Sequence, residues 1–412
     1  MRRLESKLRG FGLSALAALA LGPASPGLAE EGTWTTLANM PTPRMLLGAC
    51  VVDGKVYAVG GAPAPHAGIA VVEEYDPATN AWTPKAPMPT ARAGLGVSVV
   101  NGKIYAIGGL PLGARTVEEY DPATNAWTRK ADMPTARGFL TTSVAGGKIY
   151  AIGGGTDTST PAFKTVEEYD PETDQWTRKA DLPEARYLHA AAVAGGKIYI
   201  AGGSWLPRTA SRALFVYDPA TDVWERKADT PAAKSWLCGA EADGKVYVLG
   251  GDFAPPKATV EEYDPATDTW RSLPDMPYPR GSMAAATLGN TIYVAGGTIT
   301  LLSDVQSTFE AFVPNPVAGY FKRGDANADD KLDIADAVFV LGYLFSQEDA
   351  PACADTADAN DDGTIDIADA IALLGHLFAA AGPLPQPFEA CGPDPTPESP
   401  AELACNSYAN CS

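Results

Sequence analysis

The sequence has few histidines, and few cysteines outside its C-terminal region. His66, His189 and His376 are far apart in the chain, which disfavours a catalytic or metal site built from clustered histidines. Cys50 and Cys238 stand alone, and we expect both to be small buried residues of inner strands. No nucleophile elbow or zinc motif occurs. The sequence therefore favours a binding protein over an enzyme.

Positive charge is scarce towards the C-terminus. The chain carries a net charge of -19, and most of it follows Gly324, where Lys331 is the one basic residue. We therefore expect no nucleic-acid partner. The remaining four cysteines also lie in this region and favour two disulfides in an exported protein. Three pairings are possible, and proximity alone favours Cys353–Cys391 and Cys405–Cys411.

Long apolar runs are also missing. Phe11–Leu21 is apolar but too short to span a bilayer, and it lies between basic residues and the small residues Gly27–Ala29. This pattern is typical of a secretory signal peptide over residues 1–29. We expect no membrane span and a secreted, periplasmic or cell-surface location.

One motif, "TVEEYDPATNAW" at Thr116–Trp127, recurs along the chain. Related copies occupy Val71–Trp82, Thr165–Trp176, Leu214–Trp224 and Thr259–Trp270. Tryptophan recurs at positions 34, 82, 127, 176, 224 and 270, and six apolar runs end in a glycine pair. A period of this length, made only of short strands and turns, predicts a β-propeller.

Each unit predicts four strands, a to d, with a tight turn such as Asn101–Lys103 between strands a and b. The last unit has its glycine pair and a degraded strand c at Phe309–Pro314 but no tryptophan. The missing piece is at the other end, because Gly32–Arg44 matches Asn125–Arg137. The N-terminal segment is therefore expected to supply strand d of a sixth blade and to remove exposed sheet edges.

The double glycine, tyrosine and tryptophan at fixed offsets resemble the kelch repeat family over Gly32 to Gly319. The resemblance implies a mainly β fold, a six-bladed propeller over residues 30–319. Tyrosine and tryptophan are expected to fill the space between blades. The repeated Glu-Glu pair is expected to be a solvated strand face, so function should lie where the copies differ.

Two acidic stretches, Asp325–Asp336 and Asp358–Asp369, have the same spacing of oxygen-bearing residues. A hard cation needs six to eight oxygen ligands around a turned loop, which predicts two Ca²⁺ sites. The expected side-chain ligands are Asp325, Asn327, Asp329, Asp333, Asp336, Asp358, Asn360, Asp362, Asp366 and Asp369. Lys331 and Thr364 are expected to contribute backbone carbonyls.

Each acidic loop precedes an apolar segment with helical spacing, and each ends in Asp. This arrangement resembles the dockerin family, so residues 320–382 are expected to form a small α-helical, EF-hand-like module. The resemblance implies a cohesin-like protein partner, and we expect Ile334 and Ile367 to be apolar anchors. Asp330 stands where glycine is expected in the first loop, and the partner-choosing positions depart from the family pattern. Residues 383–412 form a proline- and cysteine-rich tail.

A basic residue precedes strand a in every unit and is expected to ring one mouth of the central channel. The six are Arg44, Arg92, Arg137, Arg186, Lys234 and Arg280. In kelch propellers that bind acidic peptides, arginines at this position line the pocket, although here they could equally cap backbone carbonyls. Trp205 and Trp236 lie outside the repeat pattern. They complete an expected ligand patch with Arg186, Tyr187, His189, Lys234 and Phe253.

Together these patterns predict an exported binding or scaffold protein. Its propeller would recognise a glycan or acidic ligand, and its dockerin-like module would tether it to an extracellular partner. The alternative is a carbohydrate-active enzyme, because a sialic-acid epimerase uses a six-bladed kelch fold. No catalytic residue of that enzyme is matched here.

Overall fold

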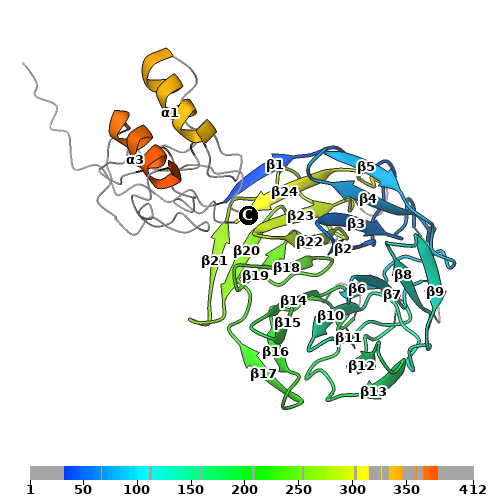
Figure 1. Cartoon of the computed structure of the whole chain (residues 1–412). Helices are drawn as coiled ribbons and strands as arrows, with labels where there is room; N and C mark the ends of the chain where they lie inside the picture. Colours follow the sequence, from blue (N-terminus) through cyan, green and yellow to red (C-terminus); the bar gives the residue numbers. More distant parts are fainter. Residues whose placement is uncertain are drawn as a thin grey trace, which may run out of the picture.

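A computed structural model gives the architecture of the chain (Figure 1). It describes residues 32–65, 67–110, 114–157, 160–206, 209–252, 255–300 and 304–314 of the repeat region. Towards the C-terminus it describes residues 326, 334–346, 357, 359 and 365–378. The expected signal peptide, His66 and the expected disulfide cysteines lie outside these residues.

Six four-stranded antiparallel sheets surround a central axis, as the sequence predicts. The first blade contains β2 Gly48–Val52, β3 Lys55–Val59, β4 Val72–Asp76 and β5 Ala81–Pro84. The second contains β6 Gly96–Val100, β7 Lys103–Ile107, β8 Val117–Asp121 and β9 Ala126–Arg129. The third contains β10 Thr141–Ala145, β11 Lys148–Ile152, β12 Val166–Asp170 and β13 Gln175–Arg178.

The remaining blades follow the same plan. The fourth contains β14 Ala190–Ala194, β15 Lys197–Ala201, β16 Leu214–Asp218 and β17 Val223–Lys227. The fifth contains β18 Cys238–Ala242, β19 Lys245–Leu249, β20 Val260–Asp264 and β21 Thr269–Leu273. The sixth combines β22 Ala284–Leu288, β23 Thr291–Ala295 and β24 Phe309–Val313 with β1 Thr33–Thr36 from the start of the chain.

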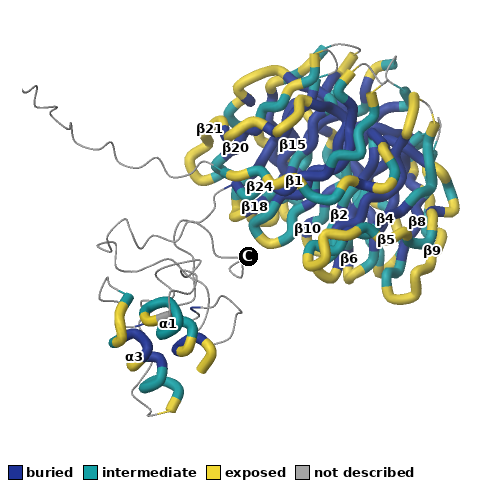
Figure 2. The backbone as a smooth tube through the Cα atoms, turned by 90° about the horizontal axis from the view of Figure 1, so that it is seen from above, coloured by how far each residue is buried: buried dark blue, intermediate teal, exposed yellow. Residues whose placement is uncertain are grey.

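The closure by β1 confirms the prediction made from the displaced tryptophan. Strand β1 pairs antiparallel with β24, and Trp34 lies opposite Phe312 in the register. The inner strands β2, β6, β10, β14, β18 and β22 contact one another in a closed circle. Figure 2 shows the buried residues in the interior of the propeller and the exposed ones at its turns.

Repeated side chains hold neighbouring blades together. In each blade the tryptophan indole N–H donates to a backbone carbonyl just after strand d of the preceding blade, over 2.7 to 3.1 Å. The tyrosine of strand c is buried between blades; Tyr75, for example, packs edge-on against Phe309 at 4.7 Å. The expected role of both aromatics in filling the space between blades is confirmed.

Two helices lie in the C-terminal region, α1 Ile334–Ser346 and α3 Ile367–Phe378. They pack against each other around a small core that includes Val340 and Leu373. In the part of the chain that is described, neither helix combines the length and apolarity required to cross a bilayer.

Candidate functional site at the central channel

A closed ring of backbone hydrogen bonds surrounds one end of the central channel. Two residues before each inner strand, one residue adopts a positive φ between 54° and 62°. Its N–H donates to the carbonyl at the same position of the preceding blade, over 2.7 to 3.1 Å. The six residues are Leu46, Gly94, Phe139, Leu188, Trp236 and Ser282. Because every donor is paired within the ring, this end of the channel has a fixed backbone frame.

The six basic residues expected to ring the mouth lie inside the blades instead. Their exposed fractions are 0 to 2%. Five form ion pairs with the first glutamate of strand c in the same blade; Arg137 lies 2.8 Å from Glu167, and Lys234 lies 2.8 Å from Glu261. Arg137 also donates to the carbonyls of Ala151 and Gly153. The expected placement is therefore corrected: desolvated glutamates and carbonyls draw these cations inward, where they cap backbone groups.

The same contacts correct the expectation of a solvated Glu-Glu face. The first glutamate of the pair is buried with the arginine, as in Glu118, which lies 2.7 Å from Arg92. The second accepts a hydrogen bond from the strand b tyrosine; Tyr105 donates to Glu119 over 2.6 Å. The pair therefore satisfies polar groups within the blade.

Blade four departs from this pattern. Phe215 occupies the place of the strand c glutamate, and the guanidinium of Arg186 lies 4.9 Å from the centre of its ring. Arg186 pairs instead with Glu184, whose side chain is partly exposed, at 3.0 Å. Burial is the main cause that lowers the pKa of Arg186 to about 10. Blade four also departs from the inner apolar layer, because His189 stands where four blades have a leucine such as Leu140 and the sixth has Met283.

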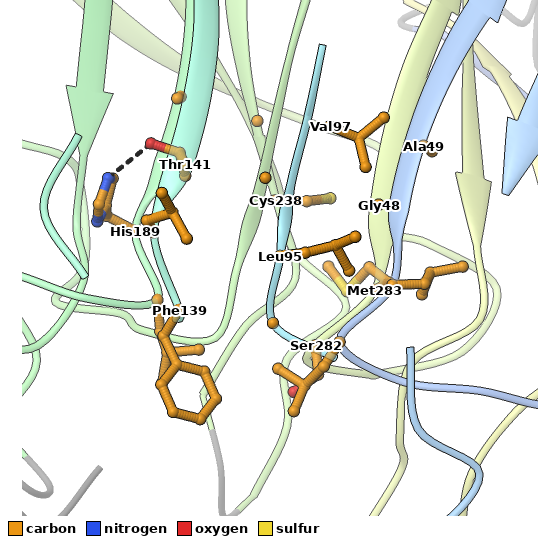
Figure 3. Close-up of a pocket in the computed structure, with 18 of the residues that line it drawn as sticks. Gly48, Ala49, Leu95, Val97, Phe139, Thr141, His189, Cys238, Ser282 and Met283 are labelled. Atoms are coloured by element: carbon orange, nitrogen blue, oxygen red, sulfur yellow. Dashed lines mark hydrogen bonds between the residues drawn. The ribbon is translucent and has the colours of Figure 1, made fainter. Parts of the chain in front are cut away.

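A cavity of about 190 Å³ lies in the channel beside the backbone ring (Figure 3). Most of the side chains that line it are apolar, among them Ala49, Leu95 and Val97. The polar side chains among its lining residues are Thr141, Thr142, His189, Cys238 and Ser282. No acidic side chain, lysine or arginine is among the described residues that line it.

His189 joins two blades at the cavity. Its Nε2 lies 2.7 Å from Oγ1 of Thr141 in the preceding blade, as Figure 3 shows, while its buried Nδ1 has no hydrogen-bond partner among the residues that the structure describes. Burial, followed by the positive charges of Arg186 and Arg137, lowers the pKa of His189 to about 3. The imidazole is therefore neutral at pH 7 and forms a neutral hydrogen bond with Thr141.

An aromatic cluster lies at the backbone ring. The rings of Phe139 and Trp236 are 6.4 Å apart, and Phe139 is equally far from buried Tyr187. Trp205 is 55% exposed, and its carbonyl accepts the N–H of Ala162, a member of the same cluster. The structure thus brings Tyr187 and Trp236 of the expected patch together, whereas Phe253 lies outside the described residues.

The two cysteines of the propeller are buried and free, as expected. Burial raises the pKa of Cys238 to about 12 and that of Cys50 further. Neither thiol is therefore ionised at neutral pH, which disfavours a nucleophilic role.

Three of the expected calcium ligands lie among the described residues. Asp336 and Asp369 are fully buried in the first turns of α1 and α3. Asp369 accepts the N–H of Asp366 over 2.7 Å, which caps the start of α3. The others lie outside the described residues: Asp325, Asn327, Asp329, Lys331, Asp333, Asp358, Asn360, Asp362 and Thr364.

Several cavity residues were not identified from the sequence. Phe139, Thr141 and Ser282 are examples. Thr141 stands where the other blades have glycine, alanine or cysteine, and Ser282 stands where they have glycine or a large apolar residue, so comparing the six copies position by position would have singled out both hydroxyls. The sequence did not indicate the positive φ at the ring position, because only Gly94 among the six residues is a glycine.

Comparisons with known proteins agree with this architecture. Residues 29–203 match the KLHDC2/KLHL20/DRC7 Kelch-repeats domain, and residues 185–231 and 238–277 match the Kelch motif. A solved structure entitled "Structure of YjhT" is 18% identical, with a TM-score of 0.57, over 66% of this chain and 96% of its own. No curated protein matches. The chain therefore contains kelch repeats arranged as a six-bladed β-propeller.

Proposed function

We propose that this chain is an exported binding protein whose propeller recognises a glycan at the backbone-ring end of the channel. The observation that carries the proposal is the aromatic cluster where the repeats diverge, with Phe139, Tyr187 and Trp236 packed beside the cavity of the central channel. Aromatic faces beside hydrogen-bonding groups suit the apolar face and hydroxyls of a sugar ring. An acidic ligand receives less support, because the six basic side chains are buried within the blades.

The C-terminal region is proposed to be a calcium-dependent, dockerin-like tether. Asp336 and Asp369, the last residues of the two acidic loops, are buried at the helix starts, where a nearby divalent cation would offset their charge. No step of ligand recognition at the propeller depends on this cation.

A repeated apolar surface supports docking by this module. Ile334, the proposed anchor of α1, is 54% exposed, and Ile367 in α3 is 53% exposed. Other large apolar side chains are exposed at matching positions of both helices: Val338, Phe345, Ile371 and Phe378. Large exposed apolar side chains in a module this small are typical of a protein-binding face. We propose a cohesin-like protein as the partner.

Binding and tethering have separate tests. A glycan and acidic-peptide array probed with the wild type, Trp205→Ala and Trp236→Ala tests recognition, and weaker glycan binding by Trp236→Ala is expected. Equal binding by all three proteins would contradict a glycan site at the backbone-ring end of the channel. A pull-down in Ca²⁺ with wild type and with Ile334→Asp/Ile367→Asp tests the tether, with chelator as control. Capture of the same cohesin-like partner by a correctly folded double variant would contradict the anchor role.

Export is proposed from residues 1–29 and the C-terminal cysteines. Mass spectrometry of the mature N-terminus in a secreting host tests it; retention of Met1–Ala29 in the exported fraction would contradict the proposed cleavage.

The alternative is a carbohydrate-active enzyme of the sialic-acid epimerase type. The His189–Thr141 pair in the cavity is the observation that keeps this alternative in view. Incubation with sialic acids and simple sugars, followed by NMR, tests it directly. Turnover abolished by His189→Leu would replace the binding proposal with an enzymatic one.

A further inference from the structure

The charge of the cavity bears on the kind of ligand it takes. The nearest strongly basic groups, such as Arg137 and Arg186, are enclosed in the blades and engaged with carboxylates and backbone carbonyls. A charged ligand in the cavity would find no side chain for an ion pair among the described residues that line it. The cavity therefore favours an uncharged ligand. This step rests on the proposed function and narrows its ligand class.

The histidine fixes the direction of a hydroxyl group. The neutral imidazole of His189 carries one proton, which has two alternative positions, Nδ1 and Nε2. Placing it on Nδ1 would bury an N–H donor that has no acceptor in the described part of the propeller, which is the more costly arrangement. The proton therefore sits on Nε2 and is donated to Oγ1 of Thr141 over 2.7 Å. The hydroxyl hydrogen of Thr141 is then available for an acceptor in the cavity.

A second hydroxyl lines the same cavity. Oγ of Ser282 is buried and has no hydrogen-bond partner within the described part of the chain. A buried hydroxyl without a partner costs free energy that a ligand acceptor would recover. Thr141 belongs to the third blade and Ser282 to the sixth, so the two donors lie on different sides of the channel.

We propose that the cavity binds a small neutral sugar, with the hydroxyls of Thr141 and Ser282 donating to sugar oxygens. His189 is a positioning residue, because it acts through Thr141. Trp236 and Phe139, which also line the cavity, supply the apolar contact. The cavity, at about 190 Å³, exceeds the ~30 Å³ of a single water molecule several times, so a solute of this class has room.

Calorimetric titration of the full chain tests the proposal. The neutral probes are glucose, galactose and N-acetylglucosamine, and the charged probes are glucuronic acid and N-acetylneuraminic acid. At least one neutral sugar is expected to bind more tightly than the charged ones. Thr141→Val and Ser282→Ala should each weaken its binding roughly three- to tenfold, the effect of one neutral hydrogen bond. Thr141→Ser should restore binding.

Ser98→Ala is the matched control, because Ser98 is a buried hydroxyl bonded to Thr142 over 2.9 Å and is not among the lining residues. It should leave affinity unchanged. Neutral-sugar binding that survives both Thr141→Val and Ser282→Ala would overturn the inference. Charged sugars binding best, with sensitivity to Trp236→Ala, would overturn it while the proposed function stands. If no probe sugar binds and the glycan array shows no binding, both the neutral-sugar inference and the proposed glycan-binding function would be overturned.

Discussion

The indole of Trp34 stacks on the ring of Phe312, with centroids 4.6 Å apart and planes inclined by 27°. One residue comes from the first strand of the propeller and the other from the last, so this contact joins the ends of the repeat region. The Trp34 indole also donates to the carbonyl of Pro274 in the fifth blade. A single side chain thus links two blades and both ends.

Trp34→Ala should therefore destabilise the whole propeller. We expect a loss of roughly 1–3 kcal/mol in the free energy of unfolding, because stacking, burial and an indole hydrogen bond disappear together. Urea unfolding followed by circular dichroism measures it. Trp205→Ala is the matched control: Trp205 is exposed, so its loss should cost no more than about 0.5 kcal/mol. Equal losses in the two variants would contradict the closing role of Trp34.

The buried pair of Arg137 and Glu167 gives a second prediction. Arg137→Met leaves Glu167 buried without its cation, and such a change costs about 3–5 kcal/mol. Arg137→Lys should cost much less, because Lys234 already fills this position in the fifth blade. Arg137→Met/Glu167→Gln should recover part of the loss. If Arg137→Met were as stable as Arg137→Lys, the pair would not be structural.

The side-chain placement of the six basic residues could not be predicted from the sequence. The spacing located all six basic residues at the entries to the inner strands, but position along the chain does not give side-chain direction. The repeats held a partial signal: a basic residue and the first glutamate of strand c occur together in five blades, and blade four keeps Arg186 although Phe215 replaces the glutamate. The fold was more predictable, because glycine pairs and tryptophans recur at a fixed period and Trp34 identifies the closing strand.

The cavity was less predictable than the blades. It depends on non-glycine residues with positive φ, such as Phe139 and Trp236, whose conformation is imposed by hydrogen bonds from adjacent blades rather than by local preference. His189 was expected to belong to an exposed patch. In the structure it occupies the position of a core leucine. Its burial depends on the packing of two neighbouring blades and cannot be inferred from one repeat.

His189 also predicts a pH dependence of stability. Its pKa of about 3 in the folded state lies below the ~6.5 of an unperturbed histidine, so the unfolded state binds more protons between these values. The stabilising contribution is therefore present above pH 6.5 and is lost as pH falls towards 3. By pH 5 this amounts to about 2 kcal/mol.

His189→Leu provides the control, because leucine occupies this position in four of the other five blades. Comparing urea unfolding of wild type and variant at pH 7.5 and pH 5 cancels the contributions of shared groups. The wild type should lose about 2 kcal/mol more than the variant over this range. Parallel losses would show that His189 is not buried and neutral in the folded protein.

Calcium binding by the C-terminal region is the last prediction. Asp369 is fully buried in the first turn of α3 and accepts the N–H of Asp366, so its side chain serves both as a helix cap and as a proposed cation ligand. Asp369→Asn keeps an oxygen for the cap but removes the negative charge. Titration of the full chain with Ca²⁺ should give two bound ions in the wild type and one in this variant. Asp181→Asn, which alters an exposed carboxylate beside Arg178 in the propeller, should leave both ions bound. Two ions bound by Asp369→Asn with unchanged affinity would remove Asp369 from the ligand set, and no bound ion in the wild type would refute the calcium sites altogether.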